Sequence, residues 1–160
     1  MIRSNLYKTV ICAALLVTDP SLASEQVNST ASVIDGDTIE IHGQRIRLFG
    51  IDAPEGRQEC NRGGEAWLCG KDAALALADK IGSDPLECSP KDRDRYGRTV
   101  AVCRLDGEDL NAWMVREGWA LAYRHYSLDC VADEDAAREA KRGIWASEFT
   151  PPWEWRRGNR

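Results

Sequence analysis

The sequence predicts an α+β domain built on a small barrel or a curled sheet, and three observations lead to this class. Short β-rich runs come first, a helical pattern follows them, and a second pair of β-rich runs precedes two further helical patterns. Strands grouped in this way, rather than alternating with helices, are typical of α+β folds. The chain has 160 residues, of which 43% are hydrophobic and 29% are charged, and this suits one globular domain.

Residues 1–23 have the pattern of an export signal. Two basic residues precede the apolar run of residues 9–17, and small residues stand at positions 21 and 23, the spacing that a signal peptidase reads. A membrane anchor is the alternative, but a spanning helix needs about 20 residues. We therefore expect cleavage after Ala23, a secreted or periplasmic domain of residues 24–160, and no membrane attachment after cleavage.

The β-rich first segment of the domain is predicted to hold three runs of strand, at residues 27–34, 37–41 and 44–51. His42 and Gly43 suit a tight hairpin turn between the second run and the third. Pro54 ends the segment, because proline cannot donate to a ladder and restricts the residue before it.

A loop that contains glycine and cysteine leads into a helix predicted over residues 71–82. Its apolar pairs at helical spacing are Leu75 with Ala78, or Leu77 with Ile81, and a glycine stands at its end. Either pair can form the buried face.

Residues 86–107 predict a hairpin with a long, charged loop, and two more helices follow it. The first, within residues 107–120, is amphipathic and stops at Gly118. The second, within residues 132–145, has acids in its first turn and bases in its last, which complements the helix dipole, and stops at Gly143.

The tail cannot continue as a helix past its two prolines at positions 151 and 152. Its tryptophans, Trp153 and Trp155, stand beside Arg156 and Arg157. They either pack against the barrel or form an exposed binding strip. The other tryptophans of the mature chain's helical half are expected in the core: Trp113, Trp119 and Trp145.

Export favours disulfide bonds among the five cysteines that follow the signal. Cys88 and Cys103 flank the charged loop of the predicted hairpin, and Cys60 and Cys69 flank part of the loop after residue 55. We expect these two bridges, with Cys130 free, while reduced and buried thiols are the alternative. The absence of a C-x-x-C motif and the presence of only two histidines argue against zinc.

The acidic balance of the chain counts against a nucleic-acid surface spread over the whole molecule. The formal charge is −5, and loss of residues 1–23 removes two bases and one acid and leaves −6. Affinity for a polyanion comes largely from lysine and arginine. A nucleic-acid function therefore needs a local cluster, such as KDRDRYGR at residues 91–98, or a bound cation.

Asp37 and Asp52 are the candidate metal ligands, because each lies near a strand end and carboxylates suit calcium or magnesium. Two carboxylates are few for calcium, so carbonyls, waters and substrate must complete its ligands. Arg47 and Asp52 are five residues apart and point oppositely in a flat strand. Both reach one site only if the strand bulges or Asp52 has left it. Asp35 is expected to cap the turn at Gly36.

Three sequence blocks resemble the staphylococcal nuclease (thermonuclease) family in order and spacing: DGDT at residues 35–38, RIRLFGIDAPE at residues 45–55 and DRYGR at residues 94–98. The likeness covers most of the mature chain. It implies a five-stranded OB-type β-barrel with about three helices, and a calcium-dependent nuclease that hydrolyses DNA and RNA, with single strands preferred. We expect a monomer.

The resemblance also assigns roles to individual residues. Calcium ligands would be Asp37, Asp52 and the carbonyl of Ala53, where the family often has threonine. The catalytic residues would be Arg47 and Arg98, which bind the scissile phosphate, and Glu55, which activates the attacking water. Substrate contacts would come from Tyr96, Tyr123 and Arg95, although Arg95 and Asp94 also suit ordinary turn charges. A further tyrosine of the family is replaced near His125.

These residue types fit phosphodiester hydrolysis independently of the resemblance. A cation and two guanidiniums offset the charge of the phosphate, and a carboxylate can polarise water as a general base. One rival is a module that binds nucleic acid or envelope polysaccharide without turnover, since OB barrels bind both. Another is a glycosidase with two carboxylates, which would survive chelation and has no need of paired arginines.

Overall fold

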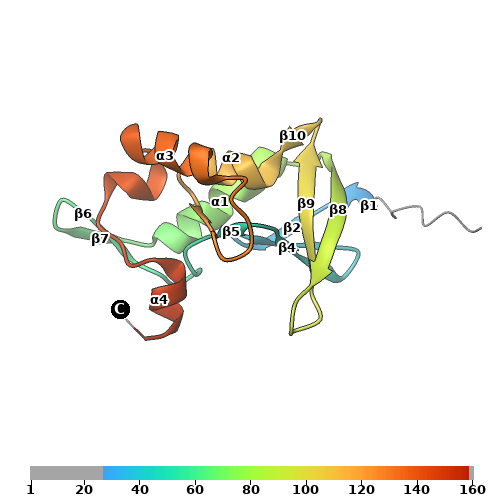
Figure 1. Ribbon diagram of the computed structural model, residues 1–160, viewed down its shortest axis with the longest axis horizontal. Helices are drawn as coiled ribbons and strands as arrows, with labels where there is room; N and C mark the ends of the chain where they lie inside the picture. The colour runs from blue at the N-terminus through green and yellow to red at the C-terminus, as the bar shows by residue number, and fades with distance from the viewer. Residues whose placement is uncertain (1–26, 159–160) are drawn as a thin grey trace, which may run out of the picture.

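The structure is a computed structural model that describes residues 27–158, so the predicted export signal lies outside the described residues. The sheet forms one side of the molecule, and the helices gather on the other, with α4 (Pro152–Arg156) set apart below them in Figure 1. No helix within the described part is long and apolar enough to cross a membrane.

The main sheet runs in the order β1-β8-β9-β4-β3-β2, and β10 pairs with β9. Its bounds are β1 (Val27–Thr30), β2 (Ser32–Asp35), β3 (Thr38–Ile41), β4 (Gln44–Leu48), β8 (Pro85–Arg93), β9 (Thr99–Leu105) and β10 (Glu108–Asp109). The β4–β9 pair is parallel and the other pairs are antiparallel.

The sheet curls round on itself. β1 and β2 lie at opposite ends of the strand order, yet only Ala31 separates them along the chain, and β1 also contacts β3. The α+β class with an OB-type sheet is confirmed. Within residues 27–158 the sheet has seven strands rather than five, because the predicted run at 27–34 divides at Ala31 and the two-residue β10 is added.

The turn between β3 and β4 forms where the sequence predicted it. His42 and Gly43 have φ values of 50° and 75°, the left-handed pair that a two-residue hairpin requires. Alternate residues of the strands then face the core, as Ile39, Ile41, Ile46 and Leu48 do, each at most 3% exposed.

Helix α1 (Cys69–Ile81) begins two residues before the predicted start at 71 and buries Leu77 and Ile81, while Leu75 is 49% exposed. The second of the two predicted faces is therefore the buried one. Helix α2 (Leu110–Arg116) is capped by the Asp109 side chain, which accepts from the Ala112 N–H, and ends before Gly118 as predicted.

The prediction for the last helices was partly wrong. Helix α3 (Val131–Glu139) ends before Gly143, and that glycine begins a 3-10 turn, η1 (Gly143–Ala146). A Cβ at Gly143 would overlap the Gly118 carbonyl oxygen, so two backbone segments lie in direct contact here. The tail is helical rather than broken, because Pro152 occupies the first turn of α4, where a missing N–H costs nothing.

Short pairs complete the fold. The predicted loop after residue 55 contains a hairpin of β6 (Cys60–Arg62) and β7 (Glu65–Trp67), and β5 (Ile51–Asp52) pairs with β11 (Leu121–Ala122).

Both predicted disulfides are present, Cys60–Cys69 and Cys88–Cys103, and the second joins directly paired residues of β8 and β9. Cys130 is free and buried, as predicted. Burial, with repulsion from nearby aspartates, raises the pKa of its thiol to about 12.

The tryptophans predicted to lie in the core lie partly buried against it. Trp113 and Trp119 pack on the main cluster under the sheet, and Trp145 packs on a second cluster around the Cys60–Cys69 disulfide. Trp153 joins that second cluster, so the packing alternative holds for this tail residue.

Candidate active site

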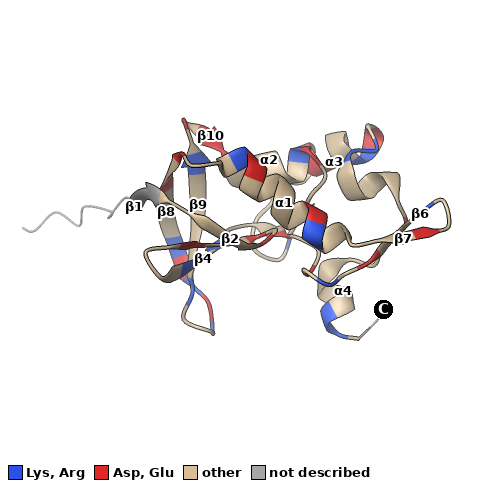
Figure 2. Ribbon diagram, turned by 180° about the vertical axis from the view of Figure 1, so that it is seen from behind, with Lys and Arg blue, Asp and Glu red and all other residues tan. Residues whose placement is uncertain are grey.

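A cleft of about 640 Å³ opens where β4, the β8–β9 loop and helix α4 come together. It brings most of the predicted site residues into one place: Asp37, Arg47, Ala53, Glu55, Arg95, Tyr96, Arg98 and Tyr123. Asp52 is fully buried directly behind its wall. The charged loop of the β8–β9 hairpin projects at the edge of the sheet, where blue and red segments alternate in Figure 2.

The turn between β2 and β3 places Asp37. Asp35 caps this turn as predicted, since its Oδ1 accepts from the Asp37 N–H at 3.0 Å. Gly36 has no room for a side chain, because a Cβ there would lie 2.7 Å from the Ala53 Cβ. The close approach lets the Ala53 N–H donate to Asp37 Oδ2 at 3.2 Å.

Asp37 is only 4% exposed, and its environment favours the protonated form of the carboxyl. Burial raises its pKa, the Arg47 guanidinium lowers it, and the nearby carboxylates Asp35 and Asp52 raise it again, so that the pKa reaches about 7. A site with closely spaced carboxylates of this kind favours a bound cation.

Asp52 reaches the same point because the chain turns after β4. Gly50 adopts φ +75°, and β5 then pairs with β11, with Asp52 opposite Leu121. Buried Asn111 holds the turn from the helical side, donating from Nδ2 to the Phe49 carbonyl at 2.9 Å. Of the two predicted ways to bring Arg47 and Asp52 together, the structure shows that Asp52 has left the strand.

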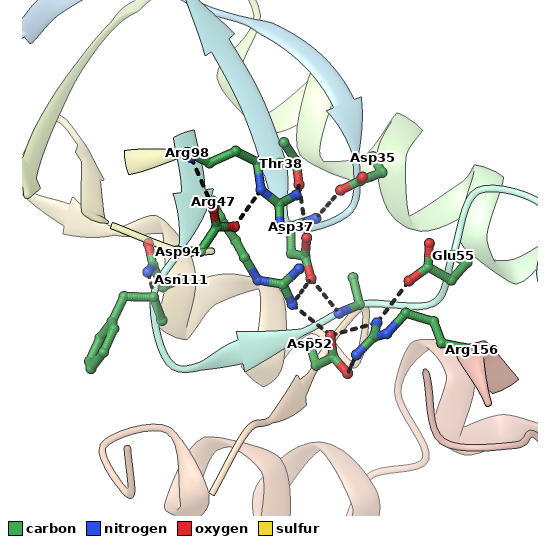
Figure 3. Close-up of polar contacts among 12 residues, drawn as sticks. Asp35, Asp37, Thr38, Arg47, Asp52, Glu55, Asp94, Arg98, Asn111 and Arg156 are labelled. Carbon is green, nitrogen blue, oxygen red and sulfur yellow. Dashed lines mark hydrogen bonds and ion pairs between the residues drawn. The ribbon is translucent and has the colours of Figure 1, made fainter. Parts of the chain in front are cut away.

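Arg47 bridges the two aspartates, as Figure 3 shows. Its Nη2 lies 3.0 Å from Asp37 Oδ2 and 2.7 Å from Asp52 Oδ1. Burial lowers the pKa of this guanidinium, but the attraction of both carboxylates outweighs burial and raises it. One positive nitrogen therefore already lies between the two candidate metal ligands.

Arg98 approaches from the β8–β9 hairpin and is held by Asp94, a residue whose role the sequence left open. Arg98 Nε donates to Asp94 Oδ2 at 2.7 Å, and the backbone N–H groups of Arg98 and Tyr96 both donate to Asp94 Oδ1 at 2.9 Å. Burial alone would raise the Asp94 pKa, but these hydrogen bonds outweigh it and lower the pKa. Asp94 thus folds the turn and orients the arginine.

Glu55 stands on the loop between β5 and α1, and three contacts fix this loop. Gly70 comes so close that a Cβ there would overlap the Glu55 carbonyl oxygen. Buried Gln58 accepts from the Glu55 N–H at 3.2 Å and donates to the Thr150 carbonyl at 2.6 Å. The Cys60–Cys69 disulfide closes the same loop.

Arg156 of helix α4 enters the site, and sequence reasoning did not assign it there. Its Nη1 and Nη2 donate to both oxygens of Asp52 at 3.0 and 2.8 Å, and Nη1 donates to Glu55 Oε1 at 2.7 Å. Burial lowers its pKa, but the bonds to both carboxylates outweigh burial and raise it. The only signal was that two tryptophans stand beside Arg156 and Arg157 in the tail, and this pattern pointed equally to packing.

Aromatic side chains line the outer cleft. Tyr96 is 70% exposed, with the Arg95 guanidinium 5.0 Å from its ring centroid. Tyr123 stacks on Trp153 at 5.8 Å and meets Tyr126 edge-on at 5.1 Å. Tyr126 also lines the cleft and was not among the predicted residues.

The carboxylate oxygens present in the cleft are of the type that binds a calcium ion. Asp37 Oδ2 and Asp52 Oδ1 converge on one nitrogen of Arg47, which shows that both oxygens face one cation position. Among residues 27–158, no three His, Cys, Asp or Glu side chains cluster as a complete metal site. Calcium would therefore depend on backbone carbonyls, water and substrate for its remaining oxygens.

Known proteins with similar sequences indicate the family of this chain. Residues 45–147 match the family described as staphylococcal nuclease homologue. The succinoglycan biosynthesis protein ExoI of Rhizobium meliloti (strain 1021) is 42% identical over 142 residues, which span 86% of this chain and 74% of that protein.

Two relatives carry nuclease names. An uncharacterized endonuclease of Escherichia coli O157:H7 is 36% identical over 145 residues, 86% of this chain and 89% of the relative. The micrococcal nuclease of Shigella flexneri is 31% identical over 171 aligned positions, 96% of this chain and 93% of the relative. The chain belongs to the staphylococcal nuclease family of nuclease hydrolases.

Proposed function

We propose that this protein is a calcium-dependent nuclease that hydrolyses phosphodiester bonds of DNA and RNA. The observation that carries the proposal is the convergence of two aspartates and Arg47 on one point beside Glu55. The family and its nuclease-named members support the same activity.

Asp37 and Asp52, with the carbonyl of Ala53, are the residues that would hold calcium. A bound calcium ion supplies positive charge to a phosphate oxygen and to the attacking water. Arg47 lies against both aspartates, so its guanidinium is placed to bind the same phosphate.

Arg98 and Glu55 complete the proposed chemistry. Arg98 is held by Asp94 through its Nε, and its Nη1 lies 3.5 Å from the Thr38 hydroxyl, which itself donates to Asp37 Oδ1, so the guanidinium points toward the Asp37 side of the cleft (Figure 3). The Glu55 side chain is 34% exposed and can contact water, as a general base must. It would accept the proton of a water molecule that attacks the phosphorus.

The substrate surface is proposed to consist of Tyr96, Tyr123 and Arg95. The exposed ring of Tyr96 offers a face for a base, and Trp153 supports the ring of Tyr123 from behind. These contacts read no base edge, so we expect cleavage of both DNA and RNA, with a preference for unpaired strands. We also expect the enzyme to be a monomer. The signal-like residues 1–23 support export to the periplasm or the medium.

An OB-type module that binds without cutting is the second candidate. It is favoured by the contact of Arg156 with both Asp52 and Glu55, which occupies the proposed metal ligand and base in the structure. The relative named for succinoglycan biosynthesis makes an envelope polysaccharide a second ligand to test.

The test is cleavage of heat-denatured DNA by the purified protein, in calcium and in excess chelator. An Asp37→Asn variant is compared with Asp92→Asn, an exposed carboxylate on the same cleft. The proposal predicts cleavage only with calcium, loss in Asp37→Asn and retention in Asp92→Asn. Binding of DNA without cleavage would instead support the binding module, and cleavage that survives chelation would contradict calcium dependence.

A further inference from the structure

Helix α4 carries a positive group into the proposed metal site from the far end of the chain. Arg156 is 104 residues from Asp52 in sequence, yet its two terminal nitrogens contact both Asp52 oxygens. The same Nη1 also contacts Glu55 Oε1. One guanidinium therefore engages both the proposed calcium ligand and the proposed general base (Figure 3).

These contacts use the atoms that catalysis would need. Asp52 Oδ1 already accepts from Arg47 at 2.7 Å, so with Arg156 it has two donors, and Oδ2 accepts from Arg156 at 2.8 Å. Asp52 is fully buried, so a guanidinium and a divalent cation at the same carboxylate would repel each other with little screening by water.

The packing of helix α4 on the core is made by residues other than Arg156. Its side chain is 35% exposed, whereas the neighbouring Pro152 is buried and Trp153 stacks on Tyr123. The helix is thus anchored by its first residues, and the arginine projects from its last position. Arg156 also lines the cleft shared by Arg47 and Arg98, so a phosphate in that cleft lies within the region open to it.

We propose that Arg156 is a second internal cation, beside Arg47, that pairs with Asp52 and Glu55 until calcium binds, and that Arg156 then binds substrate phosphate. The inference rests on the calcium dependence proposed above. Its consequence is that Arg156 lowers calcium affinity in the free protein and strengthens binding of nucleic acid when calcium is present.

The test compares Arg156→Gln with Arg157→Gln. Arg157 is the adjacent arginine of the same tail, 72% exposed and paired with Glu154, so its loss controls for the change of charge. Calcium binding is measured by calorimetry on the purified protein without nucleic acid. Thermal unfolding is measured in calcium and in chelator, and binding of a phosphorothioate oligothymidylate is measured in saturating calcium.

Removal of the competitor should tighten calcium binding about tenfold in Arg156→Gln, as expected for a typical coupling between two ligands of one site. The calcium-induced rise in melting temperature should grow accordingly. Oligonucleotide binding should weaken about tenfold. Arg157→Gln should leave calcium binding within about twofold of the wild type, since that residue lies away from Asp52.

A purely structural role for Arg156 would weaken both kinds of binding, so opposite changes identify the exchange. Calcium binding that is unchanged or weaker in Arg156→Gln overturns the proposal, as does oligonucleotide binding that equals the wild type. If the wild type binds calcium and only these differences are missing, the proposed function stands. If no form of the protein binds calcium, with or without the oligonucleotide, the proposed calcium dependence fails as well.

Discussion

The two arginine-carboxylate pairs at the edges of the site are built in opposite ways. Arg98 and Asp94 are four residues apart on one hairpin loop, and the same carboxylate accepts from two N–H groups of the turn. Arg156 reaches Asp52 and Glu55 across more than 100 residues, from a helix that follows the rest of the fold. One side of the site is a local structure, whereas the other depends on the assembled domain.

The two sides of the site should therefore be sensitive to different substitutions. The hairpin side should tolerate changes elsewhere in the domain, since its contacts are made within residues 94–98. The position of Glu55 depends on Gln58, on the Cys60–Cys69 disulfide and on the packing of the tail. Substitutions far from the cleft should therefore also lower the cleavage rate.

A large effect on the cleavage rate is expected on the hairpin side. Arg98→Ala removes a guanidinium proposed to bind the phosphate, and we expect the cleavage rate to fall about 100- to 1,000-fold, as for the loss of a single charge-stabilising donor. Arg45→Ala is the matched control, because the Arg45 side chain is 61% exposed and pairs with Glu40. Equal rates for the two variants would exclude Arg98 from the chemistry. Initial rates on denatured DNA measure the effect.

The two disulfides lie on different sides of the site. They close loops with sequence separations of 9 and 15 residues. Loss of either should destabilise the fold by about 3 kcal/mol in the chain-entropy model, measured by urea unfolding. Cleavage below the unfolding range should fall only in Cys60→Ala/Cys69→Ala, because that bridge closes the Glu55 loop. A similar fall in Cys88→Ala/Cys103→Ala would contradict the assignment of the Glu55 side.

Gln58→Leu should disrupt the contacts that hold the Glu55 loop, although Gln58 itself does not line the cleft. It leaves the Glu55 N–H and the Thr150 carbonyl without their side-chain partner. We expect a loss of about 2 kcal/mol or more in the free energy of unfolding, from the unpaired polar groups. Gln44→Leu, at an exposed position of β4, is the control. Denaturant unfolding gives both values, and equal stability would show that Gln58 is not a structural link.

Asp94→Asn has the smallest expected effect. The amide keeps an oxygen for the N–H groups of the turn but loses the ion pair with Arg98, so we expect a rate decrease of about tenfold, equivalent to one weakened charged hydrogen bond. The folded-state pKa of Asp94 is lowered. Its stabilisation is therefore complete above the unfolded pKa of about 3.9 and is lost as pH falls through the lower folded value.

The stability difference between wild type and Asp94→Asn should accordingly shrink below about pH 4, near the ordinary pKa of aspartate. Thermal unfolding across this range measures it, with Asp92→Asn as control. A difference that grows on acidification would contradict the ion pair.

Local patterns explain what could be predicted from the sequence. His42 and Gly43 form the predicted turn because their left-handed conformations are a property of the two residues themselves. The cross-strand disulfide could also be predicted from the sequence, because Cys88 and Cys103 flank the loop of one hairpin. Asp37 and Asp52 could be grouped before their geometry was known, because each stands near the end of one of two neighbouring predicted strands, and the family resemblance added Arg47 to them.

The missed features depend on tertiary contacts. Helix α4 was missed because prolines that end one helix can also begin another, and only its packing selects the second outcome. Arg156 has no local partner that links it to Asp52. From the sequence alone, Gln58 is a polar loop residue and would be expected on the surface. Its burial becomes clear only from its contact with Thr150 in the folded structure.

Glu55 is proposed to activate water in a site that cuts nucleic acid. The most direct measurement compares Glu55→Gln with Glu59→Gln, an exposed glutamate of the same loop, in calcium with denatured DNA. Cleavage by Glu55→Gln should fall about 100- to 10,000-fold, the range for loss of a general base, while binding of the phosphorothioate oligonucleotide persists. Glu59→Gln should cleave like the wild type. Full cleavage by Glu55→Gln would contradict the claim.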